Sequence, residues 1–279
     1  MLVLSHFQAV ALLQAWRLNQ PGIQLSPDLG LSQVAVTLDE NGAYFPSSAA
    51  LAWEVVDAIA ADPNVCYRVE QGEAIPIRVY SADFDRLYSL YPTLSAPTML
   101  VSGIPMHRIK DTDPWQDTRS KVKALALSGG RVLDTATGLG YTAILAAQAE
   151  CDVVTVELDP ATQEIARQNP WSQPLFANPR IHQVLGDCCA VIEGFPGGYF
   201  ARILHDPPAF SLAGEMYSLA FYRQAYRALK PNGRMFHYIG NPQSKSGAVQ
   251  TRGAAQRLRQ AGFRRVEPCP QAFGLLACK

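Results

Sequence analysis

The residues that most constrain the fold form one continuous pattern, Val132-Leu133-Asp134-Thr135-Ala136-Thr137-Gly138-Leu139-Gly140-Tyr141-Thr142-Ala143. A short apolar strand ends on a carboxylate, passes through a turn with two glycines and continues as a helix over residues 141–149. Glycines allow a tight turn and a close approach of the backbone to a ligand, and the start of the helix presents N–H groups there. The pattern predicts a ligand site at the carboxyl end of a strand.

The carboxylate decides which ligand this turn suits. The letters also satisfy the dinucleotide pattern G-x-G-x-x-G/A, with Glu157 near the spacing expected of a ribose-binding acid. Asp134, however, stands where a pyrophosphate would lie, and Coulomb repulsion penalises two adjacent anions. S-adenosylmethionine has no phosphate and carries an ammonium and a sulfonium. The sequence therefore favours S-adenosylmethionine over a dinucleotide.

The segment resembles motif I of the class I S-adenosylmethionine-dependent methyltransferases, with Ala136 in place of the first glycine. The resemblance extends to two later strand ends. Glu157 matches the acid that binds the ribose hydroxyls in this family, and Gly186-Asp187-Cys188 matches the adenine contact. The cofactor contacts that the resemblance implies are Asp134, Thr135, Ala136, Gly138, Gly140, Tyr141, Thr142, Glu157, Leu158, Gly186, Asp187 and Cys188. Read alone, each acid is equally typical of a helix cap.

A fourth strand end, Asp206-Pro207-Pro208-Ala209-Phe210, resembles motif IV of the same family. There the acid and a proline carbonyl accept hydrogen bonds from a planar amine, and the aromatic ring stacks on it; Asp206, Pro207 and Phe210 take these roles by resemblance. The pattern also resembles carbon-5 cytosine methyltransferases of ribosomal RNA, which need a cysteine nucleophile that does not follow nearby here. A nitrogen or oxygen acceptor is favoured over carbon. An ordinary proline turn is the structural alternative.

The order of elements predicts an α/β fold. Alternating strand and helix patterns require a parallel sheet, because parallel strands need crossover helices. The predicted strands are residues 131–134, 153–157, 181–185, 201–205 and 234–239, and the predicted helices are residues 141–149, 160–168, 216–229 and 248–260. A closing hairpin, residues 263–267 and 273–278, adds an antiparallel strand. We expect the class I methyltransferase sheet, mostly parallel and seven-stranded, with helices on both faces.

The N-terminal third shows a different pattern of predicted secondary structure. A helix over residues 6–17, a hairpin around Asp39-Glu40-Asn41-Gly42 and short strands at 66–70 and 77–80 predict a small α+β cap domain. The predicted domains are 1–100 (cap), 101–116 (linker or lid) and 117–279 (cofactor-binding domain). His107 and Arg108 in the linker, together with His205 and Tyr217, are candidate substrate contacts.

Composition excludes several classes of protein. The chain has 279 residues, 48% of them hydrophobic, and its 24 basic side chains balance 24 acidic ones, which gives no general attraction to nucleic acid. The six cysteines lack metal-ligand spacing, so we expect no metal site and free thiols. The start of the chain lacks signal-peptide character and no apolar run reaches spanning length, so we expect a cytoplasmic protein without a membrane partner.

Over nearly its whole length the chain resembles a group of predicted archaeal-type methyltransferases, sharing Ser-Gly-Ile-Pro-Met-His-Arg, His-Asp-Pro-Pro-x-Phe-Ser-Leu-Ala-Gly-Glu and a late His237-Tyr238-Ile239-Gly240-Asn241-Pro242. The resemblance implies fold and cofactor but not the acceptor. A small-molecule methyltransferase is the leading hypothesis, and a methyltransferase of RNA or a ribosomal protein is the second. The third is an aminopropyltransferase of the spermidine synthase type, a family that usually adds a richer glycine turn and a catalytic acid pair. The oligomeric state is left open.

Overall fold

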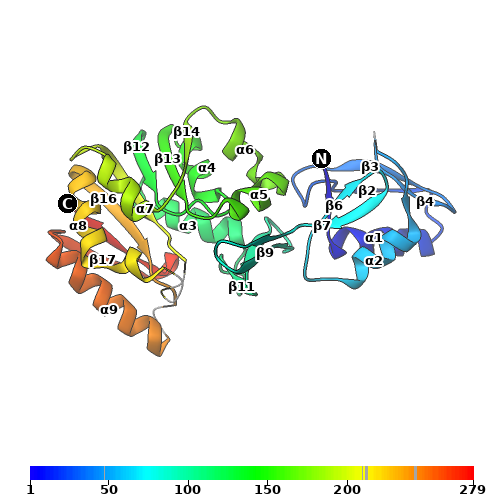
Figure 1. The fold of residues 1–279 in the computed structure, drawn as a ribbon. Coiled ribbons are helices and arrows are strands. Elements are labelled where there is room, and N and C mark those ends of the chain that lie inside the picture. Colours follow the sequence, from blue (N-terminus) through cyan, green and yellow to red (C-terminus); the bar gives the residue numbers. More distant parts are fainter. Residues whose placement is uncertain (47, 209, 211–212, 242–243) are drawn as a thin grey trace. The chain divides into compact units, whose positions relative to one another are not determined.

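The computed structural model describes residues 1–46, 48–208, 210, 213–241 and 244–279, and among its helices there is none long and apolar enough to cross a membrane. Ala209 of the motif IV pattern and Pro242 of the late pattern lie outside the described residues. The chain forms two compact units. Unit 1 holds Met1–Trp115 and Ala161–Gln173, and unit 2 holds Gln116–Pro160 and Pro174–Lys279 (Figure 1).

Unit 1 begins with the helix that the sequence predicts, α1 (His6–Arg17). Ser5 starts it through a capping box with Gln8, in which each side chain satisfies backbone N–H groups of the first turn. Helix α1 packs on α2 (Trp53–Ala61) and on the sheet β2-β3-β4-β5, and their apolar side chains form one core. The strands of this sheet are β2 (Gly22–Leu25), β3 (Val34–Leu38), β4 (Gly42–Tyr44) and β5 (Leu51–Ala52).

Two further antiparallel sheets complete the strands of unit 1. The first pairs β1 (Leu2–Leu4), β6 (Tyr67–Glu70) and β7 (Glu73–Pro76) in the order β1-β6-β7. The second has the order β11-β10-β9-β8, formed by β8 (Arg78–Ser81), β9 (Arg86–Tyr91), β10 (Thr98–Val101) and β11 (Ile104–Pro105). Within the predicted linker, therefore, β11 is a strand of this sheet. Most of α5 (Pro160–Gln168) and the turn η1 (Pro170–Ser172) also belong to unit 1.

Unit 2 is built on a seven-stranded sheet of order β14-β13-β12-β15-β16-β18-β17. Its first five strands in this order are parallel, and β18 is antiparallel to both of its neighbours. The strands are β12 (Gly130–Asp134), β13 (Cys151–Glu157), β14 (Ile181–Leu185), β15 (Phe200–His205), β16 (Leu229–Tyr238), β17 (Arg265–Cys269) and β18 (Gly274–Cys278). The predicted α/β class and closing hairpin are confirmed.

Helices cover both faces of this sheet. Neighbouring residues of β15 and β16 alternate between two cores: Ile203 and Met235 pack with α8 (Leu219–Ala228) and α9 (Lys245–Gln260), whereas Leu204 and Phe236 pack with α3 (Pro114–Leu125). The shorter helical segments of unit 2 are α4 (Tyr141–Gln148), α6 (Gln173–Ala177), α7 (Cys188–Val191), η2 (Ile192–Gly194), η3 (Gly214–Tyr217) and η4 (Pro270–Ala272).

Two segments differ from the sequence-based prediction in ways that affect the site. The predicted helix over residues 216–229 is divided, because Ser218 is extended and caps α8, which leaves the 3-10 turn η3 before it. Helix α3 precedes the first strand of the sheet and was not predicted. Its mean hydropathy is low because charged residues occupy it, yet two of those charged side chains, Asp117 and Lys121, are buried.

Candidate active site

The strand order reverses at β12, which pairs with β13 on one side and with β15 on the other. In open α/β sheets, ligands bind at the carboxyl ends of the strands beside such a reversal. Strand β12 ends on Asp134, β13 ends on Glu157, and Asp206 directly follows β15. Three of the sequence-predicted acids therefore lie at one edge of the sheet.

Asp134 is only 1% exposed, and hydroxyl groups hold one of its oxygens. Thr155 and Thr142 donate to Oδ2 over 2.8 and 3.0 Å, while Thr137 lies 2.7 Å from the Thr155 hydroxyl, to which it donates. Oδ1 is buried without a hydrogen-bond partner among the described residues. Burial, with smaller repulsion from Asp206 and Glu157, raises the pKa of Asp134 to about 8. An unpartnered buried acceptor of this kind suits a cationic donor.

Glu157 shapes the glycine turn from the neighbouring strand. Its Oε2 accepts from the Gly138 amide over 3.0 Å, and its Oε1 accepts from the amides of Leu158 and Asp159. The carboxylate is partly exposed, yet its desolvation raises its pKa. Gly140 has a φ of 77°, and a Cβ there would lie 2.6 Å from a Leu175 methyl group, so this position requires glycine.

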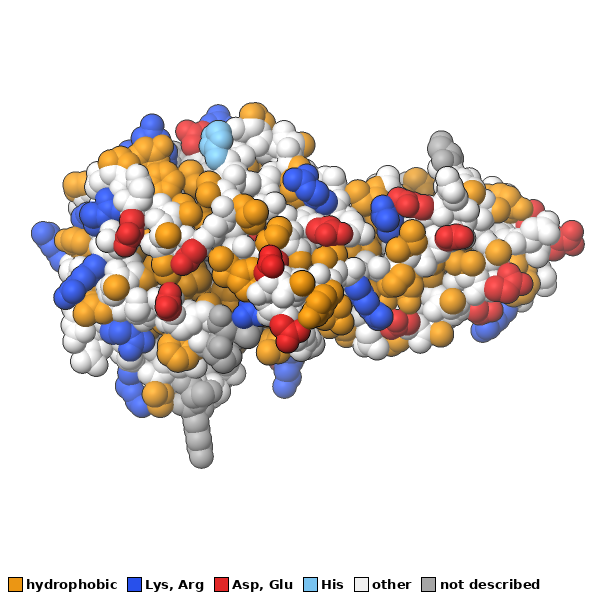
Figure 2. Space-filling view, viewed as in Figure 1, with side chains coloured by type: hydrophobic (Ala, Val, Ile, Leu, Met, Phe, Trp, Pro, Cys, Tyr) orange, Lys and Arg blue, Asp and Glu red, His pale blue; other side chains and the backbone are white. Residues whose placement is uncertain are grey.

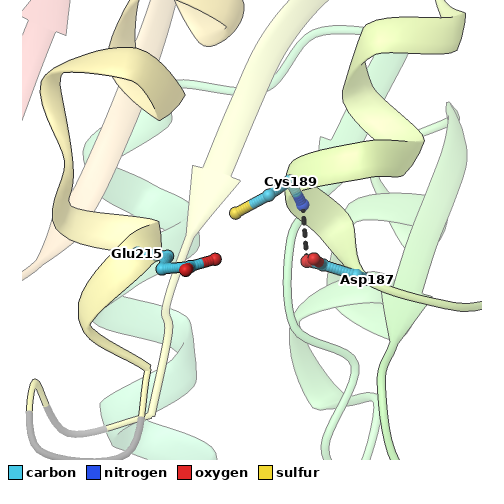
Figure 3. Close-up of side chains that lie close together, drawn as sticks. All are labelled: Asp187, Cys189 and Glu215. Carbon is cyan, nitrogen blue, oxygen red and sulfur yellow. Dashed lines mark hydrogen bonds between the residues drawn. The ribbon is translucent and has the colours of Figure 1, made fainter.

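Asp187 begins α7 and accepts from the Cys189 amide over 2.8 Å, as a helix cap does. Figure 3 shows that Cys189 and Glu215 lie beside it, and ligand atoms of the three side chains lie within 4.8 Å of one another. Burial and the neighbouring acids Asp187 and Glu215 raise the pKa of the Cys189 thiol to about 12. Because two of these residues are exposed and Asp187 serves as a cap, this cluster alone does not define a metal site.

Asp206 is bound to a buried lysine that the sequence analysis missed. The Lys121 ammonium lies 2.6 Å from Oδ2 of Asp206 and 2.9 Å from Oδ2 of Asp117, and 4.3 Å from the centre of the Tyr238 ring. Burial alone would lower the pKa of Lys121, but the two carboxylates outweigh it and raise that pKa. The i,i+4 spacing of Asp117 and Lys121 on α3 was the available signal.

The rest of motif IV is held by buried aromatic side chains. His205 donates from Nε2 to the Met216 carbonyl over 3.0 Å, so its Nδ1 accepts from the Thr135 hydroxyl over 2.7 Å. Burial lowers the pKa of His205 to about 3, and the ring is neutral. Tyr217 donates to the Pro208 carbonyl over 3.0 Å. Phe210 is 48% exposed, with its ring edge-on to Tyr217 at 5.3 Å between centroids.

The structure distributes the predicted site residues unevenly. It brings Asp134, Glu157 and Asp206 to one edge, whereas His107 lies in unit 1, where its Nδ1 is 3.0 Å from the Thr98 hydroxyl. His205 is fully buried with both ring nitrogens bonded, so we assign it to holding the end of β15. The remaining predicted cofactor positions in unit 2 fall on the turn, at the starts of α4 and α7 or directly after β13 and β14; they are Thr135, Ala136, Gly138, Gly140, Tyr141, Thr142, Leu158, Gly186 and Cys188.

The cysteines are free thiols: Cys66, Cys151 and Cys188 are buried, and the other three are partly exposed. Burial raises the pKa of Cys188. On the face shown in Figure 2, acidic and basic side chains are interspersed over each unit. That face has no continuous basic stripe of the kind that typically follows a nucleic-acid backbone.

Comparison with known proteins finds a relative that matches most of the chain. The uncharacterized protein MJ1233 of Methanocaldococcus jannaschii is 39% identical over 249 residues, which are 88% of this chain and 84% of the relative. The chain belongs to the family of that archaeal protein. No family model matches the chain.

More distant similarity points in a second direction. A polyamine aminopropyltransferase of Mycobacterium tuberculosis is 35% identical over 213 residues, 73% of this chain but only 37% of that protein. A spermidine synthase crystallised with the transition-state analogue AdoDATO superposes with a TM-score of 0.60 and 18% identity, covering 72% of this chain and 71% of that one. The superposed part of the chain contains more residues than unit 2, so the similarity of fold extends into unit 1. The fold is the Rossmann-like methyltransferase fold, which spermidine synthases share.

Proposed function

We propose that this protein is an alkyltransferase that takes a group from the sulfonium of an S-adenosyl donor and gives it to a nitrogen of a small-molecule acceptor. The observation that carries the proposal is the unpartnered Oδ1 of the buried Asp134, beside the glycine turn. This atom needs a hydrogen-bond donor, and the ammonium of an S-adenosyl ligand supplies one with a positive charge.

The charges of the site support a cationic donor. In the described part of the site, the carboxylates of Asp117, Glu157 and Asp206 outnumber the ammonium of Lys121, and Asp134 adds a further negative charge once it releases its proton. A dinucleotide would add phosphate charge to this surplus of acid, whereas a sulfonium with an ammonium offsets it. Three backbone amides donate hydrogen bonds to the Glu157 oxygens. The remaining lone pairs of these oxygens suit the two hydroxyls of a ribose.

The chain's own residues supply position and charge for the reaction. When bound, the donor supplies an electrophilic carbon next to a sulfonium. Asp206 and the Pro207 carbonyl orient the N–H groups of the acceptor, so that the nitrogen lone pair faces that carbon. His205 does not act as the base, for two reasons. Both of its ring nitrogens already form hydrogen bonds, and its pKa of about 3 makes it a weak proton acceptor.

Two transferred groups remain to be distinguished, and a separate observation favours each. Strand β15 ends Ile203-Leu204-His205 before Asp206, so it supplies one acid and not the acid pair that aminopropyl transfer usually employs. This favours methyl transfer from S-adenosylmethionine. The mycobacterial relative, the spermidine synthase fold and the surplus of acid favour aminopropyl transfer from the decarboxylated donor, which lacks a carboxylate. We place methyl transfer first and aminopropyl transfer second.

The test is to incubate the protein with each labelled donor and a panel of amines, and to identify products by mass spectrometry. Calorimetry with S-adenosylhomocysteine and with NAD provides the binding control. We expect the adenosyl ligand to bind and NAD not to bind. Binding of NAD without a response to the adenosyl ligand would overturn the proposal.

Two variants separate the donor from the acceptor. Glu157→Ala should weaken binding of the adenosyl ligand by about 1–3 kcal/mol, because hydrogen bonds to a charged group are lost. Phe210→Ala should weaken the binding of a planar acceptor that stacks on the ring by about 1–3 kcal/mol. A much smaller loss with Phe210→Ala would favour an aliphatic amine, and with it aminopropyl transfer. Tyr217→Phe, which removes the hydrogen bond to Pro208, is the matched control for disturbance of the turn.

A further inference from the structure

The buried ion triad Asp117–Lys121–Asp206 is not explained by the need to fold. A lysine that is 1% exposed loses its hydration, and replacing such buried ionic groups by apolar ones is often neutral or stabilising. Helix α3 already packs apolar side chains, Leu125 among them, on this face of the sheet. The two charged residues on α3 therefore call for a role beyond packing.

Exposure changes along the triad in one direction. The side chains of Asp117 and Lys121 are 0% and 1% exposed, whereas that of Asp206 is 15% exposed. The triad thus runs from the core to the edge of the sheet, and its accessible end is the carboxylate of motif IV. The 2.6 Å contact with Lys121 is made by Oδ2 of that same carboxylate.

We propose that Lys121 is a positioning residue, which keeps Asp206 ionised and fixes its orientation so that it accepts a hydrogen bond from the incoming amine. This rests on the proposed function, since it specifies how the acceptor side of the same site works. Asp117 holds the lysine from the other side and sets the charge of the triad at one negative unit. A neutral amine that donates its N–H groups to Asp206 fits that charge, and its nitrogen keeps the lone pair that the transfer needs.

Other titratable groups lie around the pair of Lys121 and Asp206. Asp134 on β12 and Tyr217 on η3 interact with Asp206, and Asp117 on α3 and Tyr238 on β16 interact with Lys121. Lys121 is the cation of this group, and Asp117 and Asp206 are the anions that it contacts. Without the ammonium, these two carboxylates share a poorly hydrated site, and like charges so placed cannot both ionise at neutral pH. The carboxylate of Asp206 would then hold a proton and lose its role as an acceptor.

The test combines a proton titration with kinetics. Carbon-13 NMR of aspartate-labelled, donor-free protein follows the ionisation of Asp206, with Asp206→Asn for assignment. Lys121→Met should move this titration and the acid limb of the pH–rate profile up by roughly one to three pH units. Turnover should fall about tenfold or more at neutral pH and recover at higher pH, with little change in the KM of the donor.

Asp117→Asn is the matched variant that keeps the cation. Lys121 then serves Asp206 alone, so the titration should move down instead of up, and this variant tests the proposal even if Lys121→Met does not fold. The double variant should titrate between Lys121→Met and the native protein. A titration of Asp206 that is the same in all variants, or a loss of turnover that is equal at every pH, would overturn the proposal. Absence of transfer from either donor in the native protein would instead overturn the proposed function, while the NMR titration would still test the role of Lys121.

Discussion

Asp134 and Asp206 occupy equivalent places, at the carboxyl ends of the neighbouring strands β12 and β15, but their surroundings are opposite. Asp134 is fully buried among threonine hydroxyls, with one oxygen lacking a hydrogen-bond partner among the described residues. Asp206 is partly exposed and lies 2.6 Å from a buried ammonium. Neutral hydroxyls cannot offset the desolvation of a carboxylate, whereas an ammonium does.

Under the proposed function, the difference assigns the two carboxylates different roles. A carboxylate without a cation binds one from a ligand, so Asp134 suits the ammonium of the donor. A carboxylate that already has a cation stays ionised before any ligand arrives, so Asp206 suits an acceptor whose N–H groups must be oriented. The experiments that follow alter the two carboxylates separately.

The largest expected effect is a loss of stability when the Lys121 ammonium beside Asp206 is removed. Lys121→Met leaves Asp117 and Asp206 together without an ammonium, and breaking a buried ion pair costs about 3–5 kcal/mol. Urea unfolding at neutral pH measures the loss. The matched control is Arg180→Ala, which removes an exposed ion pair with Asp152 and should cost less than about 1 kcal/mol. Equal losses in the two variants would show that burial of the triad has no energetic consequence.

Asp206→Asn should separate catalysis from donor binding. We expect turnover to fall by roughly two orders of magnitude or more, because a misplaced nucleophile loses the advantage of proximity. Donor affinity should change much less, and Asp134→Asn should show the reverse, with affinity falling more than turnover at saturating donor. Some stability is lost as well, since Lys121 keeps only Asp117. If both variants reduced affinity and turnover alike, the division into donor and acceptor carboxylates would be wrong.

Asp134 should make donor binding pH-dependent. Its pKa of about 8 in the folded protein exceeds the unfolded value of 3.8, so the donor-free protein holds a proton that the unfolded chain releases. Stability from this group is therefore lost as pH rises between these values. An ammonium ligand displaces the proton, so affinity should rise with pH by up to about tenfold per pH unit below pH 8. Calorimetry in two buffers of different ionisation enthalpy would detect the proton release, and Asp134→Asn should abolish it.

Much of unit 2 was predictable from the sequence because its determinants are local. The alternation of strand and helix patterns predicted the sheet, and acids at strand ends placed Asp134, Glu157 and Asp206 at one edge. Carboxyl ends of parallel strands must share an edge, so such a prediction needs no knowledge of packing. Unit 1 was predicted less completely, since several of its strands are only two or three residues long and have weak periodicity, although most of them pair with their neighbours in the chain.

The sequence by itself determined the class of fold and the strand ends at which Asp134, Glu157 and Asp206 lie. Only the tertiary structure showed that Lys121 lies between Asp117 and Asp206, 85 residues apart from the latter in the chain. A charged residue on a polar helix is typical of a solvent-exposed face, and its burial depends on how α3 packs on β15 and β16. The ionisation of Asp134 and Asp206 was likewise decided by packing, because neighbours and desolvation, and not residue type, set the energy of a buried charge.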